Sequence, residues 1–132
     1  MGVTGVCELA LRARDPFALA RFYVDCFGLE ELSRDEDRVW LAAGENARLG
    51  LWRPGEKEFG DRGGSHVHFA FSVSPGMLER IADRLRAEHY SIQGPIEHDG
   101  GDRSLYLRDP EGNVVEAWDH FCRERSVEDL KS

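Results

Sequence analysis

The chain has 132 residues, which is enough for one sizeable hydrophobic core and too few for two independent domains of ordinary size. Seventeen Lys and Arg residues against 25 Asp and Glu residues give a formal net charge of −8, so nucleic acid and anionic membrane surfaces are poor candidate partners. No stretch approaches the roughly eighteen apolar residues of a membrane span, and the first residues lack the pattern of a secretion signal, so we expect a cytoplasmic protein.

The first element that the sequence predicts is a strand over residues 8–15 with one buried face. Apolar and polar positions alternate along it, with Leu9, Leu11 and Ala13 on one side and Glu8, Ala10 and Arg12 on the other. A helix follows, because Asp15 can cap it, Pro16 suits its first turn and Gly28 can end it. Three short strands are then predicted over residues 29–34, 38–42 and 48–53, and a loop rich in Gly and charge covers residues 54–65.

The same plan returns about sixty residues later. Residues 68–74 alternate in the same way, Ser74 and Pro75 predict the start of a helix that runs through residue 88, and strands are predicted over 91–97, 103–107 and 113–118. The prediction is therefore an α+β protein made of two βαβββ modules, residues 5–53 and 66–118, which form a single domain over residues 1–120, followed by a tail over residues 121–132. The apolar strand faces should lie under the helices. The opposite, polar faces of the strands that open each module, which we expect to be central, should line one curved mixed-sheet cleft.

Three stretches carry a resemblance to a known family. They are Arg14-Asp-Pro with Phe22-Tyr-Val-Asp-Cys-Phe-Gly-Leu29, then His68-Phe-Ala-Phe-Ser-Val73, then Asp109-Pro-Glu-Gly-Asn-Val-Val-Glu116. In this order and spacing the chain resembles the vicinal oxygen chelate superfamily, which includes glyoxalase I, bleomycin-resistance proteins, fosfomycin-resistance enzymes, methylmalonyl-CoA epimerase and the extradiol dioxygenases. The resemblance covers nearly the whole chain.

The resemblance implies a divalent metal ion, such as Zn, Mn, Ni or Fe, held in the cleft by three side chains. The family uses a His that opens the first strand, a His that opens the strand after the midpoint and a Glu on the last strand; the matching residues here are Glu8, His68 and Glu116. A carboxylate at position 8 departs from the pattern, although carboxylate oxygen can replace imidazole nitrogen as a ligand. Aligning Trp52 with Trp118 puts Gly50 opposite Glu116, so the first module offers no fourth ligand there.

Each ligand candidate also has a simpler interpretation. Glu116 could be paired with an arginine, His68 could be an ordinary hydrogen-bonded histidine, and Glu8 could be bonded to Arg12, two positions along the same strand face. His66 is an alternative ligand or a group that supports one.

Further residues are candidates for contact with a substrate. Arg12 and Arg103 could bind an anionic group, Trp52 and Trp118 could form walls of the cleft, and Tyr106 could donate a hydrogen bond to a developing oxyanion. Glu116 is in addition a candidate general base, because in glyoxalase-like or epimerase-like chemistry a ligating Glu can move the proton.

Two functions follow from these residues. The first is a metal-dependent enzyme of lyase, isomerase or transferase type acting on a small molecule that chelates through two adjacent oxygens. The second is a metal-free binding module that sequesters a small aromatic or cationic compound, as the bleomycin-resistance proteins do. An extradiol dioxygenase is disfavoured, because such enzymes use two imidazoles and one carboxylate, which this chain would have only if His66 substituted for Glu8. The resemblance also implies a homodimer.

Overall fold

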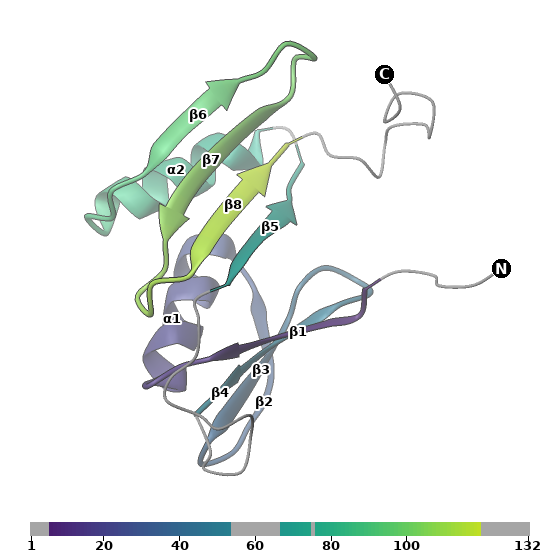
Figure 1. Ribbon diagram of the computed structural model, residues 1–132, viewed down its shortest axis with the longest axis vertical. Helices are drawn as coiled ribbons and strands as arrows, with labels where there is room; N and C mark the ends of the chain where they lie inside the picture. The colour runs from purple at the N-terminus through teal and green to yellow at the C-terminus, as the bar shows by residue number, and fades with distance from the viewer. Residues whose placement is uncertain (1–5, 54–66, 75, 120–132) are drawn as a thin grey trace, which may run out of the picture. The chain divides into compact units, whose positions relative to one another are not determined.

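The computed structural model describes residues 6–53, 67–74 and 76–119, and these fall into two compact units (Figure 1). The first unit takes the chain up to Val67 together with the turn Asp109–Gly112, and the second takes His68–Arg108 and the chain from Asn113 onward. Each unit has its own sheet and its own helix. None of the described helices is long and apolar enough to cross a membrane.

The first unit has one helix on one four-stranded sheet. Its elements are β1 (Glu8–Arg12), α1 (Pro16–Phe27), β2 (Glu30–Arg34), β3 (Arg38–Ala42) and β4 (Arg48–Trp52). The strand order is β1-β4-β3-β2, with β1 parallel to β4 and the other neighbours antiparallel. The signals read from the sequence set the limits of α1: the Asp15 carboxylate accepts from the N–H groups of Phe17 and Ala18, and Gly28 adopts a left-handed φ of 75° at the end.

The core of the first unit lies between α1 and the apolar face of this sheet. On the sheet side, Leu11, Val39, Leu41, Leu49 and Leu51 are each at most 1% exposed. On the helix side the buried residues are Leu19, Ala20, Phe22, Tyr23 and Cys26. The period-two alternation therefore separates the strands into a face under the helix and a polar face, as predicted.

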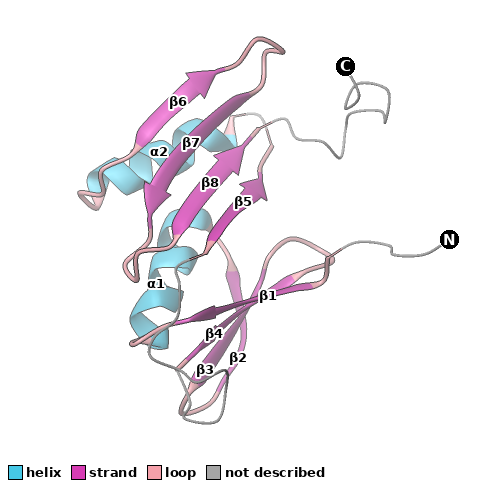
Figure 2. Ribbon diagram, in the orientation of Figure 1, coloured by secondary structure: helices cyan, strands magenta, loops and turns pink. Residues whose placement is uncertain are grey.

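The second unit repeats the plan (Figure 2). Its elements are β5 (His68–Ser72), α2 (Met77–Ala87), β6 (Gln93–Glu97), β7 (Arg103–Arg108) and β8 (Val114–Trp118), and the strand order is β5-β8-β7-β6. Buried residues of α2, among them Leu78, Ile81 and Leu85, form its core with Leu105, Val115 and Ala117 of the sheet. The predicted α+β fold of two βαβββ modules with mixed sheets is thus confirmed.

The structure corrects two details of the prediction. Helix α2 begins at Met77 after Gly76, with no side-chain cap, so Ser74 contributes only its carbonyl, which accepts from the Met77 N–H at 3.0 Å; Pro75 lies outside the described residues. Strands β1 and β5 are edge strands of their own sheets rather than central ones, because each pairs only with the last strand of its unit among the described elements.

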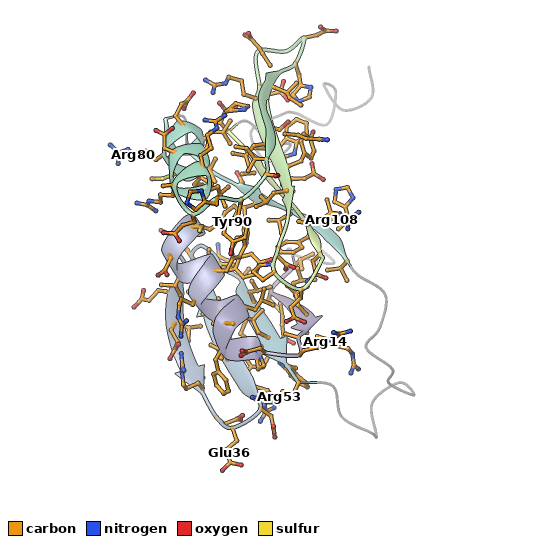
Figure 3. All side chains as sticks on the ribbon, turned by 90° about the vertical axis from the view of Figure 1, so that its left-hand side faces the viewer. Arg14, Glu36, Arg53, Arg80, Tyr90 and Arg108 are labelled. Carbon is orange, nitrogen blue, oxygen red and sulfur yellow. The ribbon has the colours of Figure 1, made fainter. Side chains whose placement is uncertain are left out.

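The turn between β7 and β8, Asp109–Gly112, is hydrogen-bonded to other residues of the first unit. The Tyr23 hydroxyl donates to Asp109 Oδ2 at 2.7 Å, and the Arg14 N–H donates to Glu111 Oε1 at 2.8 Å. Figure 3 labels Arg14 and Arg53, whose guanidinium Nη1 donates to the Arg14 carbonyl at 3.2 Å. Burial, followed by the charge of Asp109 and the hydrogen bond to it, raises the pKa of Tyr23 far above its usual value of 10.0.

Candidate functional site

The polar face of the second sheet brings together several of the predicted site residues. Tyr106 is the cross-strand partner of Glu116, and Ser104 is the partner of Trp118. Strand β5 lies on the other side of β8 in parallel, with His68 beside Val114 and Ala70 beside Glu116. Because side chains opposite each other on neighbouring strands point to the same face, these residues lie on the side away from the Leu105, Val115 and Ala117 core.

His68 and Glu116 are in direct contact through Nε2 and Oε2. The Glu116 side chain is only 12% exposed, whereas the His68 side chain is 62% exposed, so the carboxylate lies in the sheet surface and the imidazole at its edge. The second oxygen of Glu116, Oε1, accepts a hydrogen bond of 2.7 Å from the Trp118 indole Nε1. Trp118 therefore fixes the orientation of the carboxylate, as groups behind metal ligands commonly do.

A second hydrogen-bonded chain on this face ends at Tyr106. Ser104 Oγ donates to the Tyr106 hydroxyl at 3.0 Å, and His98 Nε2 lies 2.8 Å from the same Ser104 Oγ. The His98 ring also stacks on Trp118, with centroids 4.7 Å apart and planes 13° apart. Sequence reasoning did not identify His98 or Ser104. The signals available were a histidine that directly follows a predicted strand and precedes an Asp-Gly-Gly turn, and a serine two residues before Tyr106 on the same strand face.

Glu8 lies on the polar face of the first sheet and is bonded to Arg48. Arg48 is its register partner on β4, and the guanidinium approaches Glu8 Oε1 at 2.7 Å through Nη2 and at 2.8 Å through Nε. The simpler interpretation, in which Glu8 is bonded to Arg12, was therefore wrong. Arg12 lies at the other end of β1, half-buried, beside Trp52 of β4.

The rest of the first polar face consists of aromatic rings and guanidinium groups. Trp40 and Trp52 meet edge to face, with centroids 5.7 Å apart; Arg48 lies 4.2 Å from the Trp40 centroid and Arg38 lies 5.0 Å from the Trp52 centroid. The Trp40 ring occupies the space above Gly50, where a Cβ would come within 2.4 Å of its Cζ3 atom. Trp52 Nε1 lies at the same place, buried and without a hydrogen-bond partner among the described residues.

Two of the predicted site residues, Arg103 and His66, are not among those that the structure places on these polar faces. Arg103 points to the α2 side of the second sheet and forms an ion pair with Glu79 of that helix. This pair lowers the pKa of Glu79 below its usual value, mainly through the hydrogen bond from Arg103. Arg103 is therefore not placed to bind a substrate beside Glu116. His66 lies outside the described residues.

The proposed ligand set is divided between the two units. His68 and Glu116 belong to the second unit and Glu8 to the first. Among the described residues, no group of three or more His, Cys, Asp and Glu side chains is arranged to hold a metal ion.

Known proteins resemble this chain over most of its length. The virulence protein STM3117 of Salmonella typhimurium is 25% identical over 123 residues, which cover 88% of this chain and 84% of that protein. Biphenyl-2,3-diol 1,2-dioxygenase 3 of Rhodococcus globerulus is 28% identical over 105 residues, which cover 75% of this chain and 54% of the dioxygenase. Among solved structures, the lactoylglutathione lyase of Agrobacterium tumefaciens superposes with a TM-score of 0.73 at 27% identity, covering 89% of this chain and 95% of the lyase.

These relatives include a lyase and a dioxygenase by name, so the likeness does not specify one reaction. The match to a family is broader than any of these pairs. The family model covers residues 5–117, which is nearly all of both βαβββ modules. The chain therefore belongs to the glyoxalase/bleomycin resistance protein/dioxygenase superfamily.

Proposed function

We propose that this protein is a divalent-metal-dependent enzyme of lyase, isomerase or transferase type, acting on a small molecule that chelates through two adjacent oxygens. His68 and Glu116 would hold the ion together with Glu8. The contact between His68 Nε2 and Glu116 Oε2 carries the proposal. It brings one imidazole nitrogen and one carboxylate oxygen together, a pair of ligand types that suits Zn, Mn, Ni or Fe.

To serve as the third ligand, Glu8 would give up its ion pair with Arg48, and the loss of that pair would cost little stability. Its side chain is 37% exposed and that of Arg48 is 52% exposed, and a pair this accessible to water stabilises a protein by only about 0–1 kcal/mol. Three protein ligands leave coordination positions for a substrate, as catalytic sites require.

The other side chains of the second polar face suit the chemistry of an oxyanion. The bound ion would act as a Lewis acid on two substrate oxygens and stabilise negative charge that develops there. Tyr106 accepts a hydrogen bond from Ser104, so its own proton is left to donate to a substrate oxygen. Glu116 or Glu8 would take the proton that is removed from substrate carbon, and Trp118 keeps the Glu116 carboxylate oriented for that transfer.

Metal uptake tests this proposal directly. Protein purified without a chelating tag is stripped, then mixed with Mn²⁺, Ni²⁺ or Zn²⁺, and bound metal and melting temperature are measured. We expect about one ion per chain and a higher melting temperature, since a ligand at a hundred times its Kd stabilises the folded state by about 2.7 kcal/mol. His68→Gln and Glu116→Gln should abolish both effects, and Glu8→Gln should weaken them.

Glu31→Gln is the matched control. The Glu31 side chain is 36% exposed and pairs with Arg34 on the same sheet, so it resembles Glu8 in exposure and partner but is not a proposed ligand. If the wild-type protein takes up no stoichiometric metal and none of the ions raises its melting temperature, the metal-enzyme proposal is wrong. Equal loss of binding in Glu8→Gln and Glu31→Gln would remove Glu8 from the ligand set.

The second candidate function is a metal-free module that binds a small aromatic compound. The observation that favours it is the pair Trp40 and Trp52 with a guanidinium against each ring. Aromatic side chains of this kind offer stacking surface whether or not a metal ion is present. Binding of aromatic compounds by metal-stripped protein, with no turnover on addition of metal, would favour this second function.

A further inference from the structure

Arg48 is held on the first polar face by two contacts of different kinds. Its guanidinium pairs with Glu8 and also stacks over Trp40, 4.2 Å from the ring centroid. If Glu8 moves to another partner, the ion pair is lost but the stack is not. Arg48 would then stay in place with its donors free of Glu8.

The indole N–H of Trp52, beside Gly50, has no hydrogen-bond acceptor among the described residues. In the second unit the Trp118 indole N–H donates to Glu116. In the repeat, Trp52 occupies the place of Trp118 and Gly50 the place of Glu116, so no carboxylate stands at that register position, and the Trp52 N–H is buried without a partner in the part of the chain that the structure describes. A buried donor without an acceptor is unfavourable, and a ligand oxygen that reaches the Trp52 N–H would satisfy it.

Guanidinium groups already occupy the indole rings of this face. Arg38 and Arg48 lie against both rings, and Arg38 is also paired with Asp35 at 2.9 Å, so a cationic ligand would have to displace a guanidinium group from its ring. A planar anion does not meet this difficulty. Its ring can stack beside the indoles, and its carboxylate matches the fork of guanidinium donors.

We propose that Arg48, Trp40 and Trp52 form a receptor for a planar aromatic anion, whose carboxylate replaces Glu8 on the Arg48 guanidinium. This inference deepens the proposed function and rests on it for the role of the anion as substrate: when Glu8 becomes a metal ligand, Arg48 is released to bind the substrate. The receptor itself needs no metal. It can therefore be tested in metal-stripped protein.

The probe is 1-naphthoate, with 1-naphthamide as a neutral compound of the same shape. Affinities are measured by NMR titration in the presence of a chelator, and the indole N–H signals of Trp40 and Trp52 are followed. Wild-type protein should prefer naphthoate to naphthamide. Glu8→Gln should strengthen naphthoate binding about fivefold, the factor that corresponds to the loss of one competing exposed ion pair. Arg48→Gln should remove the preference for the anion, and the Trp52 N–H signal should shift on binding.

Glu31 and Arg34 provide matched control variants. Their side chains are 36% and 50% exposed, against 37% and 52% for Glu8 and Arg48, and Arg34 also lies over an aromatic ring, that of Phe17. Glu31→Gln and Arg34→Gln should leave naphthoate binding unchanged. The inference is overturned if Glu8→Gln gains no more than Glu31→Gln, or if Arg48→Gln still prefers the anion. Metal uptake with no naphthoate preference would contradict this inference alone, and a naphthoate preference without metal uptake would contradict only the metal proposal.

Discussion

The Trp40 and Trp52 side chains lie close against the backbone of Gly50 on the first sheet. A Cβ there would lie 2.4 Å from Trp40 Cζ3 and 2.8 Å from Trp52 Nε1, both well inside contact distance. We expect Gly50→Ala to destabilise the protein by about 1–3 kcal/mol, the usual cost of adding an atom to a filled space. Chemical denaturation of the two proteins measures this difference.

The same clash predicts coupling between positions 40 and 50. Removing the Trp40 ring opens the space above Gly50, so Gly50→Ala should cost much less in a Trp40→Ala background than in the wild type. A double-mutant cycle gives the interaction directly. Additive effects of the two substitutions would show that the Trp40 ring does not restrict position 50.

The candidate ligands illustrate how far the sequence could predict individual contacts. Strand alternation and the repeat placed His68 and Glu116 on one face, and the structure brings these two side chains together. Arg12 could not be the partner of Glu8, because residues four apart on a strand are separated by about 13 Å, whereas a neighbouring strand offers a residue directly alongside. That residue is Arg48, and its identity depends on which strand lies next to β1.

The turn Asp109–Gly112 is the element whose position most depends on a few polar contacts. Its Asp109 carboxylate accepts from Tyr23, and its Glu111 carboxylate accepts from the N–H groups of Arg14 and Asp15 just before α1. We expect Tyr23→Phe to lower the free energy of unfolding by about 1.5–3 kcal/mol, as is usual for a hydrogen bond to a charged group. A double-mutant cycle with Asp109→Asn separates this bond from other effects of the two changes.

The effect of Tyr23→Phe should also depend on pH. Because the pKa of Tyr23 is raised in the folded protein, its stabilising contribution is complete below the unfolded value of 10.0 and is lost as the pH rises above it. The unfolded tyrosine ionises there while the folded one stays protonated. The stability difference between wild type and Tyr23→Phe should therefore shrink between about pH 10 and 11, by up to about 1.4 kcal/mol per pH unit. A constant difference across this range would contradict the assignment.

Elements were easier to predict than their ends. The strand predicted over residues 38–42 has the same bounds as β3, because the alternation of apolar residues and the flanking turn residues indicate the same ends. The predicted start of α2 was wrong by about two residues. Ser74 and Pro75 form a standard capping signal in the sequence, but Gly76 adopts a non-helical φ of 88°, so the helix begins only at Met77. His98 could not be found from the sequence, since its stack on Trp118 depends on how β6 and β7 pair and on the turn between them.

At the scale of the whole molecule, each unit is small for an independent domain. A core built from fewer than about 70–80 residues rarely stabilises a protein by more than about 3–5 kcal/mol. We therefore expect the chain to unfold as the single domain predicted from its length, in one transition whose calorimetric and van't Hoff enthalpies agree. Two separate transitions in scanning calorimetry would show instead that the two units fold independently.

The turn Asp109–Gly112 belongs to the first unit although it lies far along the chain, and this has a consequence for dividing the chain. A cut between Val67 and His68 gives a first fragment that lacks the turn Asp109–Gly112, whose Asp109 and Glu111 are bonded to Tyr23 and Arg14, while the second fragment carries this turn. The first piece is then incomplete, and the second holds what it requires. Such fragments are suited to complementation, in which two separately produced halves regain the fold only after they meet.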